Sequence, residues 1–275
     1  MPPLRALVDA GFDVALVVSQ PDKRRGRGSA LQPSPVKAAA LELGLPVTDR
    51  VDDVLDAGAD LGVVVAFGRL IKPHVLAVLP MVNLHFSLLP RWRGAAPVER
   101  AILAGDTETG VDLMQLEEGL DTGGVYAREV VSIGPEETLD ELRSRLVAIG
   151  TDMLVRELSR GLGDAEPQAG EPTYAEKIRP EEHHLDLTQP AEQVHRVIRL
   201  GRAWTTFRGK RLRVLRARLT RVAPGEPGML DGLVVACGSG GGIELLEVQP
   251  EGKGPQPAAA WRNGARPEPG ERLGG

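Results

Sequence analysis

The sequence contains very little cysteine and no long hydrophobic run. Cys237 is the single cysteine among 275 residues, which excludes an intramolecular disulfide and any metal centre built from several thiolates. We interpret it as a small buried apolar residue. No apolar run reaches the roughly 18 residues that a membrane span needs. The first residues, Met-Pro-Pro-Leu-Arg, lack the pattern of a secretory signal. These absences favour a cytoplasmic protein that does not enter a membrane.

Negative charge is in slight excess, but the positive charges are clustered. The formal net charge is −5, from 33 Lys and Arg against 38 Asp and Glu. One stretch carries eight cations and no anion: Arg202, Arg208, Lys210, Arg211, Arg213, Arg216, Arg218 and Arg221. A second cluster lies in a Gly-punctuated segment and consists of Lys23, Arg24, Arg25 and Arg27. Two interpretations stay open, a phosphate-binding surface and an ordinary solvated one.

The first 163 residues alternate between short apolar runs and helical patterns. Buried strands are predicted at Val14–Ser19, Leu61–Phe67 and Met81–Phe86. Helices are predicted at Val36–Leu43, Pro97–Ala104 and Thr138–Leu162, the last with Thr138 as its cap. This alternation predicts an α/β domain with an open, mostly parallel, Rossmann-like sheet covered by helices on both faces.

The pattern changes after Gly163. Residues 164–180 are rich in Pro and Gly and read as a linker. One helix near Pro190–Leu200 is followed by short strands between Gly and Pro residues, which is typical of a small OB-like β-barrel. We therefore predict domains at 1–163 and 181–275. The tail from Gly252 to Gly275 is expected to be largely irregular, apart from a docked Trp261.

Asn83 and His85 attract attention because they stand two residues apart near the end of a predicted strand. Such residues point to the same side of a strand, and ligands bind beyond the carboxyl ends of strands in sheets of this class. Taken alone, an Asn-x-His pattern is a weak signal, and a hydrogen-bonded structural pair is the default interpretation.

The surrounding segments make the pattern more specific. NLHFSLLPRWRGAAP (Asn83–Pro97) and LEEGLDTG (Leu116–Gly123) resemble the folate-dependent formyltransferase family, in which an Asn, a His and an Asp form the catalytic set. The matching residues here are Asn83, His85 and Asp121. The runs SLLPRWRGAAP, QPDKRRGRG, SPVK and TYAEKI resemble the members that act on methionine carried by initiator tRNA. The resemblance covers nearly the whole chain.

The resemblance implies a defined reaction. An amine attacks the formyl carbon of 10-formyltetrahydrofolate, and a tetrahedral oxyanion develops. Asn83 would hold that oxygen, His85 would exchange protons or support the oxyanion as a cation, and Asp121 would assist His85 and the incoming amine. The order of the proton transfers stays open. No metal is needed, and His74, His183, His184 and His195 lack partners at ligand spacing.

The resemblance also implies binding residues. The folate would lie beside Phe67, Gly68, Arg69, Leu70 and Ile71, and beside Ser87, Leu88, Leu89 and Pro90. The partner would be initiator methionyl-tRNA, whose acceptor end the loop Gln20–Pro35 would enter, with Lys23, Arg24, Arg25 and above all Arg27 on the RNA. Arg208, Lys210 and Arg211 of the barrel would hold the acceptor arm by charge. A monomer is expected.

One departure from the family pattern is evident. Members begin with a further strand and a Gly-Thr-Pro loop ahead of the helix that here starts at Met1, and that strand occupies the middle of the sheet. Either the true start lies upstream or the product is damaged. We expect the chain as written to be unstable or weakly active, because the neighbours of a missing central strand lose backbone partners.

Two other functions stay open. One is a formyltransferase that acts on a different small amine, such as a nucleotide or an amino sugar. The other is a catalytically impaired, truncated remnant that binds RNA. A formylation assay on the chain and on His85→Ala separates these from the first interpretation.

Overall fold

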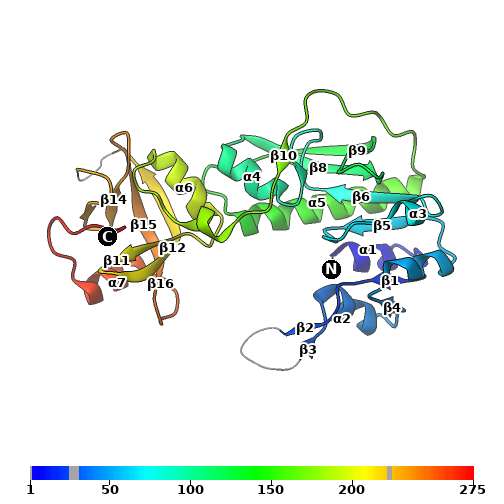
Figure 1. The fold of residues 1–275 in the computed structure, drawn as a ribbon, viewed down its shortest axis with the longest axis horizontal. Coiled ribbons are helices and arrows are strands. Elements are labelled where there is room, and N and C mark those ends of the chain that lie inside the picture. Colours follow the sequence, from blue (N-terminus) through cyan, green and yellow to red (C-terminus); the bar gives the residue numbers. More distant parts are fainter. Residues whose placement is uncertain (1, 25–30, 222–224) are drawn as a thin grey trace. The chain divides into compact units, whose positions relative to one another are not determined.

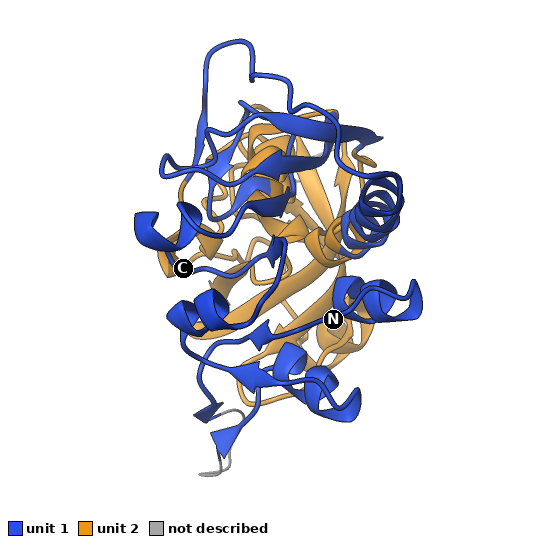
Figure 2. Ribbon diagram, turned by 90° about the vertical axis from the view of Figure 1, so that its right-hand side faces the viewer, with its two compact units in different colours: residues 1–97, 108–132, 144–175 blue, residues 98–107, 133–143, 176–275 orange. Residues whose placement is uncertain are grey.

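The computed structural model describes residues 2–24, 31–221 and 225–275. These residues form two compact units, coloured separately in Figure 2. Unit 1 comprises residues 1–97, 108–132 and 144–175, and unit 2 comprises residues 98–107, 133–143 and 176–275. Segments 98–107 and 133–143 of the predicted first domain therefore fall in unit 2, and residues 164–175 of the predicted linker fall in unit 1.

The main sheet of unit 1 has four strands in the order β5-β6-β8-β9. They are β5 (Gly62–Val65), β6 (Met81–His85), β8 (Glu108–Gln115) and β9 (Val125–Ser132). β5 and β6 pair in parallel, whereas β6 with β8 and β8 with β9 pair antiparallel. The α/β class is confirmed, but the predicted parallel arrangement applies to only one pair of this sheet. The alternating sequence of β8 and β9 is typical of antiparallel strands.

A separate two-stranded parallel sheet is formed by β1 (Val17–Val18) and β4 (Val47–Thr48). The predicted strand Val14–Ser19 is thus reduced to two residues. β5 was predicted to be buried, yet its residues are only half-buried. Within the described residues, β1 and β5 are edge strands, because each has a hydrogen-bonded neighbour on one side only. The partial exposure of the apolar side chains of β5 accords with this edge position.

Helices accompany these sheets (Figure 1). They are α1 (Pro2–Asp9), α2 (Pro35–Glu42), α3 (Pro73–Leu76) and α5 (Leu139–Arg160), with the 3-10 helix η1 (Val51–Asp56). Ser34 caps α2 by accepting the Lys37 N–H, and Thr138 caps α5 reciprocally with Glu141. α5 packs closely on the main sheet, because a β-carbon at Gly150 would lie 3.0 Å from the Val111 side chain.

Two short pairings complete unit 1. β2 (Lys23–Arg24) pairs antiparallel with β3 (Leu31–Gln32). β7 (Arg93–Gly94) pairs in parallel with β10 (Tyr174–Ala175). The second pairing matters for the site, because it ties the end of the predicted linker to the loop that follows β6.

Unit 2 is built around an antiparallel sheet in the order β11-β12-β15-β14-β13, with β16 also on β15. The strands are β11 (Trp204–Phe207), β12 (Lys210–Thr220), β13 (Leu230–Asp231), β14 (Val234–Ala236), β15 (Gly242–Pro250) and β16 (Gln256–Pro257). The helices are α4 (Pro97–Ala104), η2 (Pro180–His183), α6 (Ala191–Arg199) and α7 (Ala258–Ala265). Cys237 is buried in the core of this unit, as predicted.

The prediction of a largely irregular tail is wrong. β16 and α7 lie within it, and Trp261 docks edge-on against Phe207 with the ring centroids 5.2 Å apart. Beyond α7, Leu273 bridges Phe207 at the end of β11, and Arg272 bridges Met229 beside β13. The Pro and Gly content hid a segment that joins the two edge strands of the sheet and so supplies backbone partners to both.

Candidate active site

The candidate site is built around β6, an inner strand of the main sheet. Asn83 and His85 lie on the same side of β6, and both are nearly buried, with 9% and 5% of their surface exposed. Polar side chains tolerate such burial only when something satisfies them, so their surroundings decide what they do.

Asp121 reaches the imidazole of His85 from a different segment. Its Oδ2 lies 3.7 Å from His85 Nδ1 and accepts a 2.7 Å hydrogen bond from the Gly94 N–H. β8 runs antiparallel to β6, so its end at Gln115 lies opposite Val82. The loop that carries Asp121 must therefore run back along β6 to His85, which explains why the contact does not follow from strand order alone.

The other ring nitrogen of His85 is fixed by the main chain. His85 Nε2 lies 2.9 Å from the Trp92 carbonyl oxygen. A carbonyl only accepts, so Nε2 carries a hydrogen and Nδ1 is the nitrogen that faces the carboxylate. The pair is thus arranged so that Nδ1 can hold a proton opposite a negative charge or release it.

The Asn83 amide has a different environment. It makes no side-chain hydrogen bond to any residue that the structure describes, although it is nearly buried. Its amide is not among the side-chain atoms of the described residues that are both fully buried and unpaired, so it keeps some contact with solvent, and a ligand atom could take the place of that water. A neutral amide donor beside an imidazole and a carboxylate is the chemistry that a developing oxyanion needs.

Sequence reasoning missed an ion pair with a fully buried carboxylate, which holds the loop after β6. Asp112 is fully buried and accepts hydrogen bonds from the Leu89 N–H at 2.8 Å and from Arg128. Arg128 donates in turn to the Leu89 carbonyl at 2.6 Å. Hydrogen bonding to Asp112 raises the pKa of Arg128 further above its usual range. The signal available in the sequence was a carboxylate within the otherwise apolar stretch VDLM (Val111–Met114).

The residues predicted to bind folate fall into two groups. In the first, Phe67 packs in an apolar cluster with Val64, its carbonyl accepts from the Gln20 amide at 2.8 Å, and Gly68, Arg69 and Leu70 are exposed. Ile71 is buried.

The second group follows β6 directly. Ser87 and Leu89 are buried, and Leu88 and Pro90 are half-buried. The Ser87 hydroxyl donates to the Arg91 carbonyl at 2.6 Å, which stiffens the loop internally.

The predicted RNA contacts are distributed over both units. In unit 1, Lys23 and Arg24 are exposed on β2, whereas Arg25 and Arg27 lie outside the described residues. The barrel residues Arg208, Lys210 and Arg211 of unit 2 are all exposed.

The cations of the barrel differ in how far their charge is compensated. Arg208 forms a bidentate pair with Glu271, with both contacts at 2.7 Å. Arg211 stacks over the Trp204 ring, 4.4 Å from its centroid. The exposed cations with the least compensated charge in this group are therefore Lys210 and Arg211.

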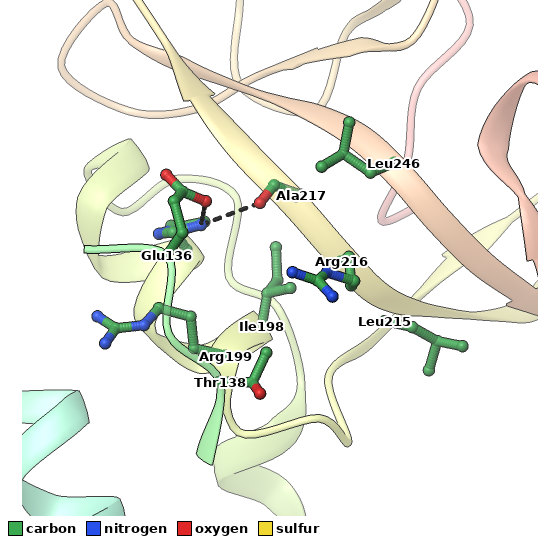
Figure 3. A pocket seen from close by; sticks show the side chains of 9 residues that line it. Glu136, Thr138, Ile198, Arg199, Leu215, Arg216, Ala217 and Leu246 are labelled. Atoms are coloured by element: carbon green, nitrogen blue, oxygen red, sulfur yellow. Dashed lines mark hydrogen bonds and ion pairs between the residues drawn. The ribbon is translucent and has the colours of Figure 1, made fainter. Parts of the chain in front are cut away.

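Unit 2 also contains a small cavity of about 30 Å³ beside α6 and β12 (Figure 3). His195 lies buried at its wall, where Nε2 donates to the Ala217 carbonyl at 3.0 Å and lies 3.2 Å from Glu136 Oε2. The Arg199 guanidinium donates hydrogen bonds to two carbonyls, those of Gly134 and Glu137. The cavity is barely larger than one water molecule.

Two negative findings apply to the described part of the chain. No three side chains of His, Cys, Asp or Glu within residues 2–24, 31–221 and 225–275 form a group that could hold a metal ion. No helix in these same ranges has the length and apolar character needed to cross a bilayer.

The family models and the most similar relatives all point to one family, the formyl transferases. The Formyl transferase family matches residues 5–158, and the family described as Formyl transferase, C-terminal domain, matches residues 177–266. The methionyl-tRNA formyltransferase of Paracoccus denitrificans is 47% identical and aligns over 94% of this chain and 92% of its own length. The enzyme of the same name from Roseobacter denitrificans is 46% identical over 100% of this chain and 95% of its own.

Solved structures share the fold at lower identity. A methionyl-tRNA formyltransferase from Clostridium thermocellum has a TM-score of 0.57 at 18% identity and covers 79% of this chain and 92% of its own. WlaRD, a sugar 3N-formyl transferase, has a TM-score of 0.68 at 16% identity and covers 92% of this chain and 94% of its own. The two matched families together span the site and the barrel, and the chain belongs to the formyl transferase family, among the methionyl-tRNA formyltransferases.

Proposed function

We propose that this chain transfers a formyl group from 10-formyltetrahydrofolate to the amino group of methionine on initiator tRNA. The observation that carries the proposal is the meeting of three groups from two segments: the Asn83 amide without a partner among the described residues, the His85 imidazole, and Asp121 with its carboxylate 3.7 Å from that ring. The names of the relatives supply the substrate, and this convergence supplies the chemistry.

The residues divide the reaction between them. The amine nitrogen attacks the formyl carbon, a C–N bond forms, and the carbonyl oxygen becomes negative. The Asn83 amide donates to that oxygen, where loss of one comparable donor typically raises a barrier by about 2.7–4 kcal/mol. Burial strengthens this hydrogen bond, because little water competes for the oxygen.

His85 and Asp121 handle the proton. The attacking nitrogen loses a proton as it becomes an amide nitrogen, and the departing folate nitrogen gains one. His85 Nδ1 is the ring atom that can carry it, since Nε2 is committed to the Trp92 carbonyl. Asp121 stabilises the cationic ring during that transfer.

Further residues of each unit would bind the substrates. The half-buried Leu88 and Phe67 offer apolar surface to the flat folate ring. Exposed Lys210 and Arg211 offer charge to the phosphates of the tRNA acceptor arm, and the Arg211 guanidinium stacks on the Trp204 ring.

One assay tests the proposal and its rivals together. Purified chain is incubated with 10-formyltetrahydrofolate and either charged initiator methionyl-tRNA or a nucleotide-linked amino sugar, beside His85→Ala. The proposal predicts formyl-methionyl-tRNA from the chain and at least about 100-fold less from the variant. Formylation of the sugar alone would select a sugar-directed enzyme. RNA binding without formylation of either amine would select the catalytically impaired remnant.

A further inference from the structure

The conformation of Asp121 requires support from outside its own loop. Its φ of +50° lies in the left-handed region, which residues other than glycine rarely occupy. Such a conformation persists only where surrounding contacts determine it. The flanking residues of the loop, Glu117 to Leu120, are exposed and offer little of that support.

The support comes from Gln168, a residue in the segment that the sequence predicts to be a mere linker. Its Nε2 donates to the Asp121 carbonyl and to the Gly123 carbonyl, both at 2.8 Å. Its Oε1 accepts from Arg93 Nε at 3.2 Å and Nη2 at 2.7 Å. Both donor hydrogens and the oxygen of the amide are therefore used, which no other side chain of this size reproduces.

Strand β7, which carries Arg93, also holds the carboxylate of Asp121. Arg93 of β7 binds Gln168, and the next residue, Gly94, donates its N–H to the Asp121 carboxylate at 2.7 Å. Gly94 has a φ of +117°, and a β-carbon there would lie 3.0 Å from the Ala175 carbonyl oxygen. Gln168 thus holds the main chain of Asp121, and Gly94, which follows Arg93, holds its side chain.

Gln168 is itself anchored on both sides. The N–H and carbonyl groups of Glu166 pair with those of Val125 at 2.9 and 2.8 Å, and β10 follows a few residues later on β7. The segment 164–175 is therefore fixed to the catalytic unit at both ends. A residue in this segment can hold a loop in place in a way that a mobile linker cannot.

We infer that Gln168 is a positioning residue that sets the Asp121 carboxylate against the His85 imidazole. This inference rests on the proposed function. It assigns no contact of Gln168 with either substrate. Its loss lets the loop relax toward ordinary backbone angles and moves the carboxylate away from Nδ1, so the rate of the chemical step falls while substrate affinity holds.

Two substitutions test it. Gln168→Met keeps the length and removes all polar contacts, and Gln168→Glu keeps the pairing with Arg93 but sets an oxygen against two carbonyls. Both are expected to lower kcat by about 10- to 100-fold, the usual result of a small misplacement in an active site. KM for the folate donor and for the tRNA is expected to stay within about twofold of that of the unaltered chain, since Gln168 is assigned no contact with either substrate.

Gln249→Met is the matched control. Gln249 lies in the other unit and has the same pattern, since its Oε1 accepts from Arg213 at 2.8 Å and its Nε2 donates to the Lys253 carbonyl at 2.9 Å. Its kcat is expected to equal that of the unaltered chain. A general cost of losing a bridging amide would affect all three variants alike.

A double-mutant cycle separates positioning from a merely structural role. In an Asp121→Asn background the carboxylate is already gone, so Gln168→Met is expected to lower kcat by less than threefold further. An equal fall in both backgrounds, unchanged kcat in both Gln168 variants, or unfolding of both would overturn the inference. No formylation by the unaltered chain would instead refute the proposed function.

Discussion

The ion pair between Asp112 and Arg128 allows a quantitative test of how the loop after β6 is held. The Asp112 side chain is fully buried, whereas 42% of the Arg128 side chain is exposed. Arg128 donates to Asp112 at 2.6 and 2.8 Å and to the Leu89 carbonyl at 2.6 Å. Removing the arginine therefore leaves a buried carboxylate whose remaining donor is the Leu89 N–H.

The expected cost follows from this asymmetry. Breaking a buried pair by removing one partner typically destabilises a protein by about 3–5 kcal/mol. Arg128 is partly solvated already, so Arg128→Met is expected near the low end, at about 3 kcal/mol. Adding Asp112→Asn removes the unpaired charge and keeps an acceptor for Leu89, and about half of the lost stability should return.

Urea unfolding at pH 7 measures these differences. Arg156→Met is the control, because Arg156 also binds two carboxylates, those of Glu129 and Glu157, but all three side chains are partly solvated. Its cost is expected below about 1 kcal/mol. Hydrogen exchange of the Leu89 amide should speed up in Arg128→Met and not in the control. The reasoning fails if the two arginine variants lose equal stability or if the double variant is no more stable than Arg128→Met.

Three further outcomes are expected. Burial raises the pKa of Cys237 to about 11, so iodoacetamide at pH 8 should label it only after unfolding, and rapid labelling of the folded chain would contradict its placement. The Arg208 guanidinium lowers the pKa of Glu271 from 4.5 to about 2, so wild type should be more stable than Glu271→Gln above pH 4.5, with the difference vanishing as pH falls toward 2; a pH-independent difference in urea midpoints would count against the pair. Lys210→Ala and Arg211→Ala should weaken tRNA binding and each reduce the salt slope of log K by about 0.7–0.9, whereas an unchanged slope would remove them from the RNA surface.

The sequence predicts elements well where one local rule decides. Pro97–Ala104 is a helix with the predicted bounds, Thr138 caps α5, and β6 covers five of the six residues predicted for it. In each case proline, a capping box or an uninterrupted apolar run acts within a few residues. The closeness of Asn83 and His85 likewise follows from strand geometry alone.

Prediction failed where pairing between distant segments decides. The tail was expected to be irregular because Pro and Gly dominate it, yet Leu273 and Arg272 bridge both edges of the barrel sheet. Gln168 was passed over in a Pro-rich segment whose order comes from contacts with Val125 and β7. The role of Asp112 does not follow from its local sequence, because its partner Arg128 lies on the next strand.

The central claim is that Asn83 donates a hydrogen bond to the formyl oxygen when the tetrahedral centre forms. Single-turnover formylation of methionyl-tRNA by Asn83→Ala, with donor and enzyme in excess, measures this step apart from binding and release. The claim predicts a rate about 100- to 1,000-fold below that of the unaltered chain, with donor affinity nearly unchanged. A variant that formylates at the wild-type rate would contradict it.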